Sequence, residues 1–475
     1  TDTDLQSYKG IMDNLSGQSR VENAMASFYG ALDYVLMNRY VANFTARTDG
    51  SNNFGAKEQF NMTWSAGLAW NMDEEAWMER IKHIISHATI RLSTGVTGGI
   101  NKSVYPVLIM SYSSEFRNSD TQAYRMGNIF SPPNEHLRWE RTRDYNGSID
   151  VGFLKNRLNM NLSFYHRKGS DLVTSVAVVT TTGYNRQSYN TSEQVNQGVE
   201  LMLSGTPVKT KDWRWSLNGN IAYNQNVLTK YDSPTGSILG DIYVDYPLGK
   251  IFTGKSTGID AETGLYTFEK RSDYDEQNPS AYTNYMFYIG TSSYPWTGGA
   301  STNLSWRNLS FSVNTSFSLG AKISNYVSPV STYSSIEKGT YNHIYNPRYD
   351  VYTAHNNVVK DAAYRWTPDN SVTDGYPRLI DAHGAALNLE ERQVLSYVQN
   401  GVFYENGSYW KISSMTLMYS LPDKLIHRFG ATSLGLSFTA NNLWIITAYS
   451  GLNPETPGAV YPMSRSFSFG LNIGF

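Results

Sequence analysis

The C-terminal stretch of the chain alternates strictly between apolar and small polar residues. Residues 465–475 read RSFSFGLNIGF, so every second side chain from Phe467 to Phe475 is apolar, and the residues between them are Ser, Gly or Asn. A period of two places all of the apolar side chains on one face of a β-strand. Because no charge interrupts that face, the stretch predicts a strand with one face out of water. The other strands must show what this face meets.

The same alternation recurs along the chain and predicts about 13 strands of roughly ten residues each, the length of a tilted membrane strand. Besides the last strand, the segments are 28–36, 40–46, 60–70, 90–96, 145–153, 158–164, 199–203, 213–223, 304–306, 309–319, 415–419 and 434–440. Trp410 and Ile412 are out of phase with Met415, which predicts a β-bulge near Ser413 and Ser414. Residues 73–87 break the pattern, and the acidic residues at their start predict a helix.

The charges of these strands all fall on one face. None of the predicted apolar-face residues is charged, whereas the opposite face carries Arg47, Arg91, Asp150, Glu200 and Arg214. A Lys or Arg that faces lipid at the midplane costs roughly 2–4 kcal/mol, whereas one that faces a water-filled lumen costs little. The pattern therefore predicts that the apolar face meets hydrocarbon.

The connections between the strands alternate in length. Short ones lie near 37–39, 153–156, 206–212, 307–308 and 421–432, and long ones near 98–136, 169–193, 227–297, 321–408 and 444–463. Short turns on one side and long loops on the other are typical of outer-membrane barrels, and only helices and closed barrels satisfy every backbone group in lipid. We therefore expect a transmembrane antiparallel β-barrel. Since the count is odd, we expect the chain to begin partway around a larger barrel.

Composition excludes several other classes. Charged residues make up 17% of the 475 residues and aromatic residues 14%, and no apolar run approaches the ~18 residues of a membrane helix. The net charge of −2 provides no basic surface for nucleic acid, and the absence of cysteine excludes disulfides and thiolate metal sites. A soluble sandwich or propeller is disfavoured, because no repeat is visible and loops this long are uncommon in soluble domains. We find no linker and expect one unit over 1–475, from a longer precursor.

Several segments resemble a known family in its order and spacing. They are NRYVANFTARTDGSNNFG at 38–55, LRWERTRDYNGSIDVGFLKNRLNMNLSFYHRKGSDLV at 137–173, NQGVELMLSGTPVKTKDWRWSLNGNIAYNQN at 196–226, GIDAETG at 258–264, YRWTPDN at 364–370, YPRL at 376–379, YWKISSMTLMYSLP at 409–422 and NNLWIIT at 441–447. The chain resembles the SusC-like TonB-dependent transporters of the Gram-negative outer membrane. The resemblance implies the C-terminal part of a 22-stranded barrel.

The resemblance also implies partners and a cargo. It implies a plug domain and a TonB box N-terminal to this sequence, TonB itself, outer-membrane lipids, and a SusD-like lipoprotein that covers the extracellular mouth. A dimer of transporter–lipoprotein pairs is one assembly that it implies. The implied cargo is an oligosaccharide or an oligopeptide, with no cofactor, metal or catalytic residue. The terminal Phe475 resembles the aromatic end of the outer-membrane assembly signal.

Three other motifs have simpler explanations. Residues 249–256 read GKIFTGKS and satisfy the phosphate-loop pattern, but the segment after them carries glycines and a turn where that loop needs a helix. His83 and His87 have the spacing of zinc ligands on a helix but lack the adjacent Glu of a metalloprotease, and a surface helix explains them better. Residues 273–276 hold an acidic cluster, Asp273, Asp275 and Glu276, without the spacing of a calcium loop.

Aromatic residues crowd one predicted long loop, and we take five of them as candidates for cargo binding: Tyr282, Tyr285, Tyr288, Tyr294 and Trp296. Stacking on sugars or peptides, the core of the loop and a partner interface would explain them equally well. For the whole chain, import of a nutrient is the first hypothesis, and a structural subunit of a larger outer-membrane complex is the second. An enzyme barrel would need a catalytic group that the sequence does not show.

Overall fold

The computed structural model contains one large antiparallel sheet of thirteen strands. It describes residues 24–52, 59–99, 109–117, 123–131, 134–179, 181, 186–231, 244–264, 266–277, 282–324, 366–371, 401, 404–422, 426, 430–459 and 461–475. In order across the sheet, the strands are β1 (Met25–Leu36), β2 (Tyr40–Ser51), β3 (Phe60–Asn71), β4 (Ile85–Gly99), β7 (Glu140–Phe153), β8 (Leu158–Ala177), β9 (Arg186–Lys209), β10 (Trp213–Tyr231), β15 (Trp296–Trp306), β16 (Leu309–Leu319), β19 (Tyr409–Ser420), β20 (Ser433–Thr447) and β21 (Ser466–Gly474). Each predicted strand coincides with one of these, and only the last, 465–475, exceeds its strand, by one residue at each end. The prediction of an all-β antiparallel sheet is confirmed.

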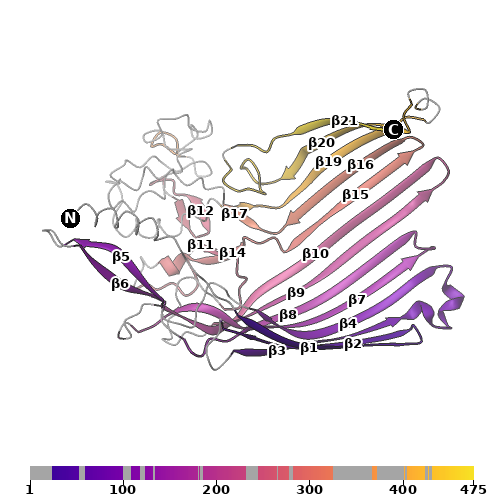
Figure 1. The fold of residues 1–475 in the computed structure, drawn as a ribbon. Coiled ribbons are helices and arrows are strands. Elements are labelled where there is room, and N and C mark those ends of the chain that lie inside the picture. The colour runs from indigo at the N-terminus through magenta and orange to yellow at the C-terminus, as the bar shows by residue number, and fades with distance from the viewer. Residues whose placement is uncertain are drawn as a thin grey trace, which may run out of the picture.

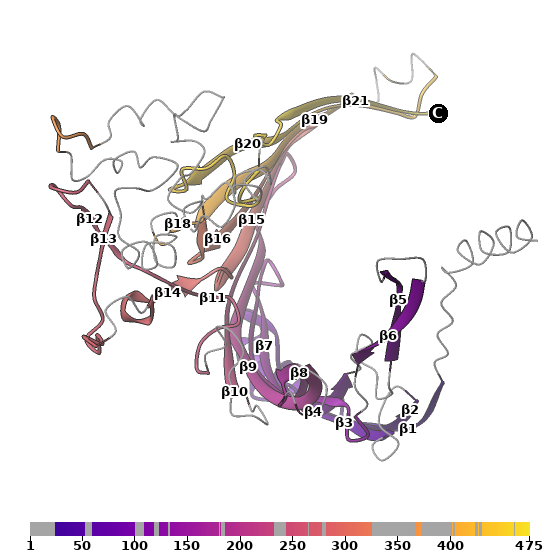
Figure 2. The ribbon, with the colours of Figure 1, turned by 90° about the vertical axis from the view of Figure 1, so that its left-hand side faces the viewer.

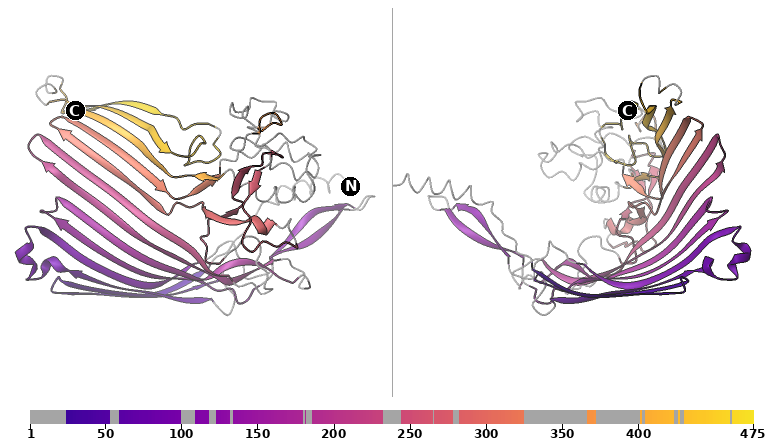
Figure 3. Two further views of the ribbon diagram at one scale, coloured as in Figure 1. Left: turned by 180° about the vertical axis from the view of Figure 1, so that it is seen from behind. Right: turned by 45° about the vertical axis from the view of Figure 1, so that its right-hand side comes forward.

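The sheet is curved across its width into an open trough (Figures 1 and 2). β1 and β21 are its two edge strands and lie at the two ends of the arc in Figure 2. Tight connections join the strands at one end of the trough, and the described parts of the long connecting segments lie at the other end (Figure 3). This is the arrangement of the wall of a barrel, in which side chains alternate between an inner and an outer face.

The register between the strands shows that they are tilted. A straight row of paired residues runs from Trp296, the first residue of β15, through Phe164 on β8 to Tyr34, near the last residue of β1. This row crosses eight strand spacings, about 38 Å at roughly 4.8 Å each, and descends from the long-loop end to the short-turn end. The apolar band of a membrane barrel is about 25 Å tall. A row about 38 Å long that descends through this height requires strands tilted by about 40° from the membrane normal, which is within the range of membrane barrels.

The predicted bulge is present in β19. Asn314 and Thr315 are neighbours on β16, yet they pair with Ser414 and Ile412, which leaves Ser413 as an extra residue. The pairing with β20 is irregular at the same position. The bulge brings Trp410 and Ile412 back onto the face that carries the other apolar side chains, which explains the phase change in the sequence.

The strands extend further toward the long-loop end than the alternation predicts. The predicted loop at 169–193 is largely strand, because β8 continues to Ala177 and β9 begins at Arg186. Beyond the membrane both faces of a hairpin meet water. The backbone pairing of the strands therefore continues there without the alternation of apolar and polar residues in the sequence. The other predicted long loops also contain strands: a hairpin of β5 (Ile109–Arg117) and β6 (Ala123–Ser131), then β11 (Lys250–Thr253), β12 (Ser256–Ile259), β13 (Tyr266–Phe268), β14 (Phe287–Thr291), β17 (Lys322–Ser324) and β18 (Tyr404–Asn406).

The prediction of a helix over 73–87 is wrong. The segment forms two short 3-10 turns, η1 (Met72–Glu74) and η2 (Met78–Ile81), and β4 already begins at Ile85, so His87 lies on a strand. The side chain of Asp73 accepts a hydrogen bond from the Ala88 N–H and lies 3.2 Å from Nδ1 of His87, so it does not cap a helix. Across the described residues, every helical segment is too short or too polar to cross a bilayer.

Glu75 anchors the connection at 72–84 to the short-turn end of the sheet. Its carboxylate accepts hydrogen bonds from Tyr40 Oη at 2.6 Å and from Trp70 Nε1 at 3.1 Å, and Arg39 lies 3.4 Å away. The bonds from Tyr40 and Trp70, followed by the charge of Arg39, lower the pKa of Glu75 below its usual 4.5. A lowered carboxyl pKa stabilises the folded state above the unfolded pKa, and this stabilisation is lost as the pH falls through the folded value.

We therefore expect acid to release the connection at 72–84. Hydrogen exchange of these amides in the full-length protein should accelerate, relative to the intrinsic exchange rate, as the pH falls below 4.5. A Glu75→Gln variant cannot ionise and should exchange at a rate that changes little with pH beyond the intrinsic chemistry. An equal acceleration in both proteins would show that Glu75 does not hold this segment.

Candidate functional site

The apolar face of the sheet is not covered by protein. Trp64, Leu162 and Phe311 are half-buried at most, and Phe469 is 84% exposed. The one cluster of buried apolar residues in the described chain, Val176 with Leu228 and Tyr231, lies on the extended ends of β8 and β10 beyond the alternating segments. A soluble sandwich would bury these side chains against a second sheet. Their exposure in a continuous band fits contact with lipid.

Two rows of aromatic residues border this band. Trp296 pairs with Tyr223 at the long-loop end, with ring centroids 4.7 Å apart, and Trp306 pairs with Trp213 at the short-turn end, with centroids 5.8 Å apart. The 11 residues from Trp296 to Trp306 on β15 are separated by steps that add up to about 33 Å along the strand, or about 25 Å along the membrane normal at a tilt of about 40°. This spacing matches that of the aromatic girdles of a membrane barrel. The positions of the Trp residues in the sequence could have indicated the girdles, whereas the period of two did not.

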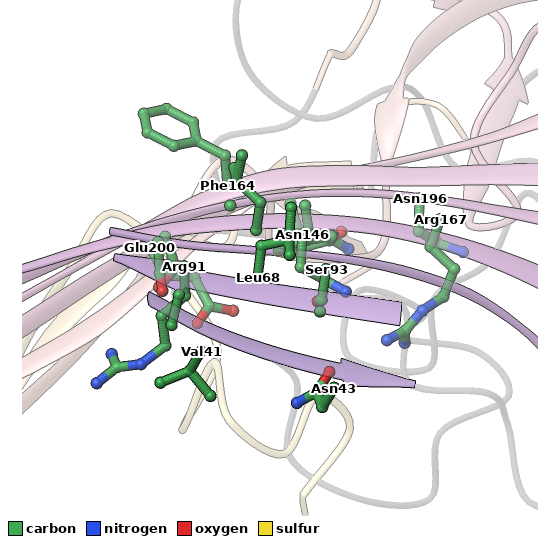
Figure 4. A pocket seen from close by; sticks show the side chains of 18 residues that line it. Val41, Asn43, Leu68, Arg91, Ser93, Asn146, Phe164, Arg167, Asn196 and Glu200 are labelled. Carbon is green, nitrogen blue, oxygen red and sulfur yellow. The ribbon is translucent and has the colours of Figure 1, made fainter. Parts of the chain in front are cut away.

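The opposite face carries the polar and charged side chains. A hollow of about 790 Å³ lies along β2, β3, β4, β7, β8 and β9. Its lining includes Asn43, Arg91, Ser148, Arg167 and Glu200. In Figure 4, Arg91 and Arg167 point to one side of the sheet, whereas Phe164 points to the other. This polar face is the lumen wall of the predicted barrel and is the candidate functional surface.

The charges of the lumen wall are largely paired with one another. Arg91 is paired with Asp150, which also accepts a hydrogen bond from Asn161 Nδ2 at 2.5 Å. Arg167 is paired with Asp144 on the neighbouring strand. These groups are partly exposed, so each pair contributes little to stability. Their chemical effect is a hydrated wall of alternating sign, which suits passage of a polar solute better than tight binding of one charge.

The predicted cargo-binding aromatic residues do not form one cluster. Tyr285 packs against Tyr274 at 5.9 Å between centroids, and burial followed by a hydrogen bond to Tyr274 raises its pKa to about 12. Tyr288 packs with Tyr246 and Phe252, and Trp296 lies in the upper girdle. Tyr282 lies in the 3-10 turn η4 (Tyr282–Tyr285), and its side chain is outside what the structure describes. Cargo binding by these residues stays a prediction.

Tyr294 connects two loops at the long-loop end of the sheet, here called the rim. Its hydroxyl lies 3.2 Å from the carbonyl oxygens of both Gly407 and Pro454, which belong to two different loops, both far from Tyr294 in the sequence. Lys411 on β19 reinforces the same junction through an ion pair of 2.7 Å with Glu455, and both side chains are mostly buried. Burial raises the pKa of Tyr294, which keeps its hydroxyl a donor. The rim above β15–β20 is therefore a connected platform.

The remaining motifs have structural roles. The segment GKIFTGKS forms β11 and the start of β12, so no helix follows it, and it has no phosphate-loop geometry. Asp273 pairs with Arg271 at 2.7 Å. Asp260 of GIDAETG accepts bonds from the Thr263 N–H and hydroxyl, and Trp366 of YRWTPDN donates to the Ala261 carbonyl at 2.9 Å. Two segments that carried the family resemblance therefore meet in space.

Comparison with known proteins decides the family. A family model described as TonB dependent receptor-like, beta-barrel, matches residues 1–251, more than half of the chain. The chain belongs to this family of TonB-dependent receptor barrels. Members of the family are receptors and transporters of the outer membrane rather than enzymes, which agrees with the expectation from the sequence.

Individual relatives agree with this assignment. The chain is 27% identical over 486 residues to TonB-dependent receptor SusC of Bacteroides thetaiotaomicron, which covers 95% of this chain and 44% of that protein. A TonB-dependent receptor of Formosa agariphila is 24% identical and covers 96% of this chain and 46% of its own length. The RagAB peptide importer in its closed-closed state shares the fold, with a TM-score of 0.77 at 22% identity over 96% of this chain and 48% of that one. The chain thus spans about half the length of the relatives it matches.

Proposed function

We propose that the chain is the C-terminal part of the barrel of an outer-membrane importer for an oligomeric nutrient. The observation that carries the proposal is the contrast between the two faces: an uncovered apolar band between aromatic rows and a charge-paired polar wall opposite. Such a wall favours passage of a hydrated polar solute. Membership of the TonB-dependent receptor family supports energy-coupled uptake.

The proposed whole protein is larger than this chain. Its barrel would have 22 strands, with a plug domain and TonB box upstream and a SusD-like surface lipoprotein over the mouth. The connected rim at Tyr294, Gly407 and Pro454 supports a stable platform for such a lid. RagAB, which shares the fold, is a peptide importer, and an oligopeptide or an oligosaccharide is the proposed cargo here. Phe475, 88% exposed directly after β21, is the proposed assembly signal.

The test is uptake by the host strain with the full-length gene deleted. We expect loss of growth on one class of oligomer as sole nutrient, oligopeptide or oligosaccharide, and unchanged growth on its monomers. Wild-type gene should restore growth, and a variant lacking the TonB box should not. Unchanged growth on every oligomer, together with retention of the receptor in a large complex, would instead indicate a structural subunit.

A further inference from the structure

A groove runs across the apolar face of the sheet, opposite the lumen wall. Its volume is about 680 Å³, within the usual range of small-molecule sites, about 300–1,000 Å³. Small residues line it, among them Ala42, Ala66 and Gly147, and the larger Leu92 and Phe164 line it as well. A Cβ at Gly147 would lie only 3.4 Å from Leu92 Cδ2, so the depth of the groove depends on the missing side chain. In a barrel this groove faces lipid.

The long-loop end of the groove lies just below the headgroup level of the membrane. Tyr145 and His166, whose rings lie 6.4 Å apart, form this end. Because the strands are staggered by about one residue at each step from β15, the girdle level of Trp296 corresponds to Arg143 on β7. The row of paired residues from Phe164 through Gly147 and Leu92 to Ala42 descends toward the short-turn end, so the apolar part of the groove begins below Tyr145 and crosses from the upper into the lower half of the apolar band.

Cations stand directly above the groove on the same face. Arg141 and Arg143 precede Tyr145 at spacings of two, and Arg143 is paired in register with Lys168 on β8. Arg141 and Arg143 are exposed, and neither has an ion-pair partner among the described residues, whereas Lys168 is 2.7 Å from Glu193. One pleat separates Arg143 from the groove, about 7 Å along the strand. Two free guanidinium groups at this level are suited to a phosphate, which Arg binds through two parallel hydrogen bonds.

We propose that this surface is a specific site for a phosphorylated, acylated lipid of the outer leaflet. One acyl chain would occupy the groove beside Phe164 and Leu92, and the phosphate would rest on Arg141 and Arg143. The two parts of the lipid match the two parts of the surface in polarity, charge and order along the membrane normal. The inference rests on the proposed membrane orientation and is independent of transport.

The test uses the full-length receptor, stripped of bound lipid in detergent and titrated with diphosphorylated lipid A under native mass spectrometry. The double variant Arg141→Gln/Arg143→Gln should weaken binding by about 30-fold, since each basic group near an anionic headgroup contributes about one factor of five. The matched control is Lys155→Gln/Arg157→Gln, which removes two exposed charges from the short turn of the same hairpin. This control should change the affinity for lipid A by no more than about twofold, because the two removed charges are farther from the proposed phosphate site than the electrostatic screening length.

The groove is tested separately. Ala66→Leu fills the groove and should weaken lipid binding by about tenfold, whereas Ala300→Leu places the same side chain on the apolar face of β15 outside the groove and should not. Lipid A without phosphates should bind like the Arg141→Gln/Arg143→Gln variant. Equal effects of test and control variants, equal binding of dephosphorylated lipid, or full displacement by inorganic pyrophosphate would each overturn the proposal. Unchanged nutrient uptake in these variants would leave the importer proposal intact.

Discussion

Replacing Val313 by Arg is expected to lower the free energy of unfolding of the full-length receptor by about 2–4 kcal/mol. Val313 lies near the middle of β16, on the apolar face, and is paired with Thr302 on β15 and Met415 on β19. A guanidinium at this depth has no water and no counter-ion within the band between the aromatic rows. Denaturant unfolding in lipid vesicles would measure the loss as a lower midpoint with an unchanged slope.

The neighbouring residue supplies the control. Ser312 is adjacent to Val313 on the same strand but points to the opposite face, where it is paired with Asn303 and Thr416. Ser312→Arg adds the same side chain to the lumen wall, where charged groups are already hydrated and paired, and should change stability by less than about 1 kcal/mol. Equal losses in the two variants would mean that the apolar face meets protein rather than hydrocarbon.

The strands could be predicted because lipid imposes a simple rule on them. Every residue between the two aromatic rows faces either hydrocarbon or the lumen. The alternation of apolar and polar residues in β16, from Leu309 to Leu319, therefore shows directly which side chains lie on which face. The bulge at Ser413 was visible for the same reason, as a break in phase. Beyond the membrane both faces of a strand meet water, so the extension of β8 to Ala177 shows no alternation from which it could be predicted.

The candidate site was harder to predict than the fold. The sequence indicated that Arg91 and Asp150 share a face but not that they pair, because pairing depends on the register between β4 and β7. The crowded aromatic residues gave no indication that Trp296 belongs to the membrane girdle while Tyr294 holds the rim. The acidic start of 73–87 suggested a helix because the sequence does not show the partners of Glu75, which are Tyr40, 35 residues away, and Trp70 at the end of the preceding strand.

Inserting one serine after Ser413 should have a still larger effect. Residues 414–420 are held by the short turn and by pairing with β16 and β20, and the bulge already holds one extra residue, so the insertion moves residues 409–412 by one position. The slip turns Trp410 and Ile412 into the lumen and Lys411 toward lipid. Removing two apolar side chains from hydrocarbon costs about 3–6 kcal/mol, and the ion pair between Lys411 and Glu455 is lost as well. Heat-modifiable migration of the full-length receptor in detergent gels should show little folded barrel.

Two further variants separate the slip from the chemistry of the bulge residue. Ser413→Gly keeps the length of β19 and removes only the hydroxyl, which lies 3.2 Å from Ser316 Oγ, so it should fold nearly as well as wild type. In the insertion background, exchanging the identities within the pairs 409–410 and 411–412 restores the alternation, since Trp and Ile return to the lipid face and Tyr and Lys to the lumen. Recovery of folded barrel in this variant is expected because the period of two, rather than Ser413 itself, fixes which face meets lipid. An insertion that folds as well as wild type without the exchange would show that the length of the bulge does not set the phase of β19.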